Sequence, residues 1–107
     1  MFGFKEIDIE GLKSAKSQEG VLLIDVRTDA EVARGMIEGA KHIPLHLLPL
    51  KANELNAGVP TIFYCQSGAR SAQACAFMSS KGHDDVYNLQ GGILAWMRDG
   101  MPLAAMC

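Results

Sequence analysis

The chain has little cysteine, no long apolar run and no block of basic residues. Its 3 cysteines among 107 residues form neither an even disulfide framework nor a C-x-x-C pair. Lys and Arg total 10 against 12 Asp and Glu, without a basic cluster, so neither nucleic acid nor an anionic membrane surface is an expected partner. The most hydrophobic stretch, Val21–Ile24, is far too short for a membrane span. We expect free thiols in a reducing compartment.

The same absences set expectations for location and size. Residues Met1–Glu6 lack the basic segment and apolar block of a secretory signal, so we expect a cytoplasmic protein. No linker, low-complexity tract or repeat divides the chain, and its length suffices for one hydrophobic core without disulfides or metals. We predict a single domain over residues 1–107, with its core at about 7–102, and a monomer.

Apolar runs alternate with helical patterns along the whole chain. Asp8 can cap one helix, and Thr28 with Glu31 has the capping-box spacing of another. The run Val21–Val26 is typical of a parallel strand covered on both faces. The patterns predict strands at 21–26, 40–43, 61–64 and 86–89, and helices at 9–17, 28–35, 47–55, 70–81 and 93–98. The alternation predicts an α/β fold whose mostly parallel sheet of about five strands has helices on both faces.

Cys65 occupies the position in this strand and helix pattern where a reactive side chain is most expected. It follows the predicted strand Thr61–Tyr64 and opens a loop of small and polar residues that leads into a helix. Ligands of open α/β sheets bind beyond the carboxyl ends of the strands. Backbone N–H groups of such a loop, together with the helix dipole, stabilise a thiolate, and Arg70 is expected to supply a fixed positive charge. The pattern therefore indicates a nucleophilic cysteine.

The alternative is that Cys65 is an ordinary buried thiol, since cysteine is among the most frequently buried residue types. The composition of the loop favours the reactive cysteine. It contains Gly68, it is too hydrophilic for a core segment, and it ends in an arginine. A purely structural thiol needs none of these features.

Three separated motifs make the chain resemble the rhodanese (sulfurtransferase) family. The resemblance extends over roughly Ile7–Pro102. The motifs are LIDVR (23–27) with Glu31 and GMIEGAKHIP (35–44), the loop CQSGARS (65–71), and YNLQGGILAW (87–96). The resemblance implies a single-domain rhodanese fold.

By the same resemblance, Cys65 matches the catalytic cysteine of the family. It would accept sulfane sulfur from a donor such as thiosulfate or a protein persulfide and carry it as a persulfide. Cyanide, small thiols and sulfur-carrier proteins are the implied acceptors, and no organic cofactor or metal is needed. The substrate-binding residues would be Gln66, Ser67, Gly68, Ala69 and Arg70.

The length of the loop narrows the reaction class. Related cysteine phosphatases have one more residue between the cysteine and the arginine, whereas this chain has four residues between Cys65 and Arg70. Phosphatase or arsenate reductase activity is therefore disfavoured. Gln66 stands where several thiosulfate-using relatives have arginine, so we expect thiosulfate to be a poor donor.

Other polar residues have simpler explanations. We interpret Asp25 and Arg27 as an ordinary ion pair at a strand end rather than as catalytic groups. Cys75 is predicted to be a buried thiol, and Cys107 a bystander or an accidental disulfide partner.

The two histidines His42 and His46 do not indicate a metal site. Pro44 lies between them and prevents a regular helix from presenting both to one ion. We expect no zinc site.

Three functions remain to be distinguished. The first is a cytoplasmic sulfurtransferase that acts through Cys65. The second is a relay module that holds sulfur between protein partners with little turnover. The third is a purely structural module, which the presence of both Cys65 and its loop disfavours.

Overall fold

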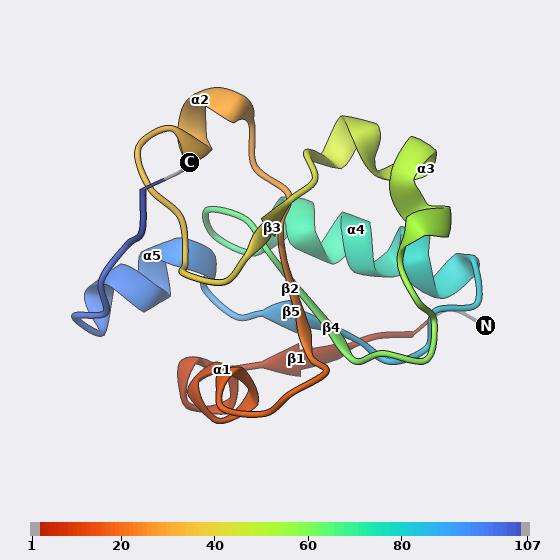
Figure 1. Ribbon diagram of the computed structural model, residues 1–107, viewed down its shortest axis with the longest axis horizontal. Helices are drawn as coiled ribbons and strands as arrows, with labels where there is room; N and C mark the ends of the chain where they lie inside the picture. The colour runs from red at the N-terminus through yellow and green to blue at the C-terminus, as the bar shows by residue number, and fades with distance from the viewer. Residues whose placement is uncertain (1–2, 106–107) are drawn as a thin grey trace.

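The computed structural model, which describes residues 3–105, is built on one parallel sheet with helices on both faces (Figure 1). The strands are β1 (Lys5–Ile7), β2 (Leu22–Asp25), β3 (Lys41–His42), β4 (Thr61–Tyr64) and β5 (Val86–Leu89). The helices are α1 (Ile9–Lys16), α2 (Asp29–Val32), α3 (Leu48–Lys51), α4 (Ala69–Ser80) and α5 (Gly92–Arg98). The strand order is β1-β5-β4-β2-β3, and every pair is parallel. This architecture confirms the predicted fold class.

Alternation along β4 decides which way the following residue faces. All four residues of this central strand are buried, and successive side chains point to opposite faces of the sheet. Ile62 and Tyr64 pack with α1 and α5, whereas Phe63 and Cys65 pack with α3 and α4. Cys65 therefore projects toward α4, the helix that its own loop leads into.

The chain reverses direction across the sheet between β4 and β2. From β2 the chain moves outward to β3, while from β4 it moves outward to β5 on the other side. A crevice at the carboxyl ends of two such strands is the usual ligand site of an open α/β sheet. The segments that start at Val26 and at Cys65 both enter this crevice.

Three elements differ from the sequence prediction. Helix α2 ends at Val32 rather than at the predicted Gly35. The edge strand β1 was not predicted, because its three residues include two charged, exposed side chains and it is defined by its pairing with β5. The helix predicted over 47–55 is wrong as a continuous element. The 3-10 turns Leu45–Leu47 and Ala52–Glu54 flank the four-residue α3. Pro49 is tolerated only near a helix start, because it has no N–H to donate.

The residues that the structure describes include no helix long and apolar enough to cross a membrane.

The start of α5 rests directly on the loop after β4. Gly92 has φ +58°, and a Cβ atom there would lie 2.5 Å from the Cys65 carbonyl oxygen. The Ile93 and Leu94 N–H groups donate to the Cys65 and Gln66 carbonyl oxygens at 2.9 and 3.2 Å. The turn at Gly91 and Gly92 is thus the point where two segments of backbone meet.

We predict that Gly92→Ala lowers the free energy of unfolding by more than about 3 kcal/mol. The new Cβ must displace the backbone of the loop, and the alanine must adopt a left-handed conformation. Gly100→Ala is the matched control, since Gly100 has φ +80° but open space around it, and should cost only about 1 kcal/mol. Urea denaturation of the two variants measures the difference. If both variants lose the same free energy of unfolding, the close approach of α5 to the loop is contradicted.

Candidate active site

The loop between β4 and α4 wraps its backbone around the Cys65 sulfur. Gly68 precedes α4 with φ +114°, a left-handed conformation that glycine adopts without strain. Its N–H donates to Cys65 Sγ at 3.1 Å. The Ser71 N–H, in the first turn of α4, donates to the same sulfur at 3.4 Å. First-turn N–H groups have no partner within their own helix, and here the sulfur is the acceptor.

These contacts outweigh the cost of burying a charge. Cys65 is only 1% exposed, and burial alone would raise the pKa of its thiol. Hydrogen bonds from the Ser71 hydroxyl and from the N–H groups of Ser71, Gly68 and Ser67 act in the opposite direction. The net result is a Cys65 pKa below its ordinary value, which favours the nucleophilic thiolate.

The Ser71 hydroxyl faces two acceptors. Its oxygen lies 3.4 Å from Cys65 Sγ and closer to Asn88 Oδ1 on β5. A hydroxyl has one hydrogen, so it donates to only one of them at a time. The Asn88 amide nitrogen in turn donates to the Gly68 carbonyl oxygen at 3.2 Å. Ser71 and Asn88 thus join β5 to the loop, and the hydroxyl is an adjustable donor to the sulfur beside the fixed N–H groups.

Arg70 carries the fixed positive charge expected from the sequence, but the structure pairs this charge with an acidic side chain. Its two terminal nitrogens donate to the Glu31 carboxylate at 2.6 and 2.8 Å. This pair lowers the pKa of Glu31 to about 2. Glu31 also completes the predicted capping box of α2 with Thr28. The helix start and the loop N–H groups add positive potential directly at the sulfur.

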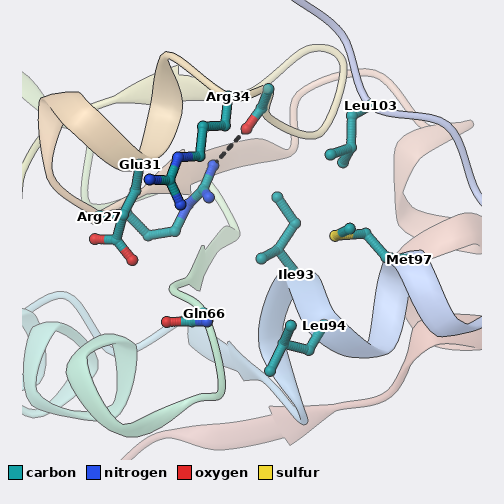
Figure 2. Close-up of a pocket in the computed structure, with 9 residues that line it drawn as sticks. Arg27, Glu31, Arg34, Gln66, Ile93, Leu94, Met97 and Leu103 are labelled. Carbon is teal, nitrogen blue, oxygen red and sulfur yellow. Dashed lines mark hydrogen bonds between the residues drawn. The ribbon is translucent and has the colours of Figure 1, made fainter.

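The other predicted loop residues lie around this ring. Gln66, Ser67 and Ala69 are exposed, and Gly68 is half-buried. Gln66 lines a cavity of about 250 Å³ with Arg27 and Glu31 (Figure 2). A second cavity of about 260 Å³ lies against Arg70. The site thus combines a buried sulfur with open space on both sides of the Glu31–Arg70 pair.

Asp25 and Arg27 form a buried ion pair, as interpreted from the sequence. The guanidinium Nε and Nη2 donate to the carboxylate at 2.8 to 3.1 Å, and Nη2 also donates to the Gly35 carbonyl oxygen at 2.8 Å. His42 Nε2 donates to the Arg27 carbonyl oxygen at 2.8 Å. These contacts tie the segment after β2 to the residues that follow α2 and to β3.

The remaining cysteines differ from Cys65 in their surroundings. Cys75 is fully buried within the face of α4 that packs on the sheet, and burial raises the pKa of its thiol to about 12. Cys107 lies outside the described residues. Across residues 3–105, no three His, Cys, Asp or Glu side chains come together as a metal-binding group.

Sequence reasoning missed Ser71 and Asn88 as parts of the site. Both are buried polar residues on elements predicted correctly. The sequence signal for Ser71 was its position on the predicted inward face of the helix that follows Cys65. Its pairing with Asn88 depends on the position of β5 beside β4.

We predict that Ser71→Ala raises the pKa of Cys65, because it removes a donor that stabilises the thiolate. The measurement is a pH titration of thiolate ultraviolet absorbance, with Cys65→Ser as the blank. Ser79→Ala is the matched control, since Ser79 is also buried on α4 but bonds to Gly3. A Cys65 pKa unchanged by Ser71→Ala would show that the hydroxyl serves only Asn88.

We predict that Glu31→Gln lowers the free energy of unfolding by about 1–2 kcal/mol at pH 7 and by less in acid. The folded pKa of Glu31, about 2, lies below its ordinary 4.5, so the stabilisation is complete above pH 4.5 and is lost toward pH 2. Glutamine preserves the capping box, which isolates the ion pair. Urea denaturation from pH 7 to pH 3 tests this, with the exposed Glu54→Gln as control. A pH-independent difference would contradict it.

The chain matches a family model and several known proteins. The Rhodanese-like domain model matches residues 8–99. A protein named sulfurtransferase from Allochromatium vinosum is 48% identical over 101 residues, 94% of each chain. Thiosulfate sulfurtransferase GlpE of Pseudomonas putida is 33% identical and covers 90% of this chain and 87% of its own length.

A solved structure gives the same assignment. The rhodanese-like domain protein from Staphylococcus aureus superposes with a TM-score of 0.85 at 32% identity, covering 97% of this chain and all of its own. The sulfurtransferase relatives support sulfur transfer as the general activity. With a family model over most of its length and a matching fold, the chain belongs to the rhodanese-like domain family.

Proposed function

We propose that this protein is a sulfurtransferase that carries sulfane sulfur as a persulfide on Cys65. The observation that carries the proposal is the donation of the Gly68 and Ser71 N–H groups to the Cys65 sulfur. These donors favour a thiolate before reaction. They also stabilise an anionic persulfide afterwards, and donors fixed in advance need no rearrangement during the reaction.

The first half-reaction loads the cysteine. The Cys65 thiolate attacks the outer sulfur of thiosulfate or of a protein persulfide. A bond forms between Sγ and that sulfur, the S–S bond of the donor breaks, and sulfite or the donor thiolate leaves with the electron pair. The product is a Cys65 persulfide anion, and the substrate-binding groups are the loop residues 66–70.

The second half-reaction returns the enzyme to its starting state. A thiophilic acceptor, such as cyanide, a small thiol or a sulfur-carrier protein, attacks the outer sulfur of the persulfide. The S–S bond on Cys65 breaks and the thiolate is regenerated, stabilised by the same N–H groups. Because both half-reactions are nucleophilic displacements at sulfur, the proposal requires no metal or organic cofactor.

Thiosulfate remains a weak candidate donor. Gln66 adds no charge at the mouth of the loop, and Glu31 neutralises Arg70. A doubly charged inorganic donor therefore meets little unpaired positive charge in this crevice. A protein or organic persulfide suits the site better.

A relay module is the second candidate function. It has the same persulfide but passes sulfur only between protein partners, without turnover on small molecules. In either case we propose a monomer in the cytoplasm, a location that suits a chain with free thiols. Neither nucleic acid nor a membrane is a proposed partner.

We predict that incubation with thiosulfate or a protein persulfide adds one sulfur atom to the protein, as measured by intact mass spectrometry. Cys65→Ser should abolish the addition, because serine cannot form a persulfide. Cys75→Ala is the matched control and should retain it, since Cys75 is buried with a raised pKa. Loading of Cys65→Ser would overturn the proposal. Absence of loading from every donor would leave a structural module.

Cyanide turnover separates the two candidate functions. An enzyme releases thiocyanate repeatedly from thiosulfate and cyanide. A relay module loads once, does not turn over with cyanide, and gives its sulfur to a carrier protein.

A further inference from the structure

The cavity beside Gln66 has two chemically different walls (Figure 2). Ile93, Met97 and Leu103 line one side, and Arg27 and Arg34 lie opposite them. Met97 is 49% exposed, so its side chain is accessible to a molecule in the cavity. The cavity is therefore apolar on the side of α5, whereas the side of α2 carries two arginines and the Glu31 carboxylate.

Only one of the charges around this cavity is left without a partner in residues 3–105. Asp25 neutralises Arg27, and Arg70 neutralises Glu31. No Asp or Glu within that range forms an ion pair with Arg34, which is exposed at the cavity wall. The unpaired positive charge favours an anionic group on the occupant.

The cavity lies beside the loop that holds Cys65, although Cys65 itself does not line it. Gln66 lines it, and the N–H groups of Ile93 and Leu94 bind the carbonyl oxygens of Cys65 and Gln66. The apolar wall is therefore fixed to the same backbone that holds Cys65. A molecule seated between α5 and Arg34 lies beside the mouth of the loop.

We propose that this cavity binds the organic part of a small persulfide donor that has an apolar body and a carboxylate. The volume of about 250 Å³ exceeds the roughly 150 Å³ that encloses a benzene-sized molecule in a protein core, but it is small for a larger ligand. The apolar body packs on Ile93 and Met97, and the carboxylate faces Arg34. This inference rests on the proposed sulfur transfer through Cys65.

The chemical step is the same displacement at sulfur. The Cys65 thiolate attacks the outer sulfur of the donor R–S–S⁻, the donor S–S bond breaks, and R–S⁻ leaves with the electron pair. The products are the Cys65 persulfide anion and an organic thiolate, so atoms, charge and electrons balance. The cavity holds R during the attack.

Arylthiosulfonates serve as stable probes of this site, since they give up the same outer sulfur and release a sulfinate. Three donors are compared by kcat/KM: thiosulfate, benzenethiosulfonate and 4-(carboxymethyl)benzenethiosulfonate. We expect kcat/KM to rise along this series. Met97→Gln should lower the ratio of either aromatic donor to thiosulfate by about 10-fold. Arg34→Gln should lower the ratio of the carboxylated to the plain aromatic donor by about 3-fold.

Matched surface variants control for unspecific effects. Leu50→Gln replaces another exposed apolar residue, and Arg98→Gln replaces an arginine of α5 that does not line the cavity. Both should leave the donor ratios unchanged. Ratios unaffected by Met97→Gln and Arg34→Gln would overturn the inference while leaving transfer from thiosulfate intact.

A binding measurement tests the assignment of this cavity independently of turnover. In Cys65→Ser, 4-(carboxymethyl)benzenesulfinate should shift the amide NMR signals of Ile93, Leu94 and Gln66, and Arg34→Gln should weaken the binding. Failure of every donor to load Cys65 would overturn the proposed function, whereas the absence of these shifts would overturn the cavity assignment.

Discussion

The structure depends on the hydrogen bonds that the first turn of α4 and the preceding loop make with the Cys65 sulfur. The donors at Gly68 and Ser71 lie within 3.4 Å of Sγ, and they are backbone groups that would otherwise lack partners. A sulfur that is almost fully buried is thereby given a polar environment on the side of the loop. Without these bonds, burial would raise the pKa of Cys65, as it raises that of Cys75.

The reversal of the chain between β2 and β4 brings the charged groups to this sulfur and also pairs them. Asp25 and Arg27 come from the segment after β2, and Glu31 crosses from α2 to Arg70 on α4. Pairing stabilises the crevice but leaves little net charge for attracting a small anion. An arginine close to a cysteine is therefore not equivalent to unpaired positive charge at its sulfur.

Helix α5 couples the site to the apolar core on the other face of the sheet. Its first N–H groups bind the carbonyl oxygens of Cys65 and Gln66, while Trp96 packs with Tyr64. The same helix therefore fixes the loop backbone and provides an apolar wall beside it. Close backbone contact is possible because residue 92 is glycine.

Local sequence determined the elements whose stability is mainly local. Thr28 and Glu31 marked the start of α2, Asp8 that of α1, and the apolar runs marked β2, β4 and β5, because caps and alternation act over a few residues. Position alone also placed Cys65 at the carboxyl end of a buried strand. The family motifs then indicated sulfur transfer as the reaction of this cysteine.

Only the tertiary structure decided which groups meet. The edge strand β1 is defined by its pairing with β5, and the Ser71–Asn88 contact requires β5 to lie beside β4. Arg70 binds Glu31, which is 39 positions away in the sequence. The sequence could identify Arg70 as a cation but not its partner, because long-range packing and not local sequence decides which residue lies opposite it. The sequence thus determined the chemical groups and their local structure, while long-range packing determined their distances and therefore their electrostatic effect.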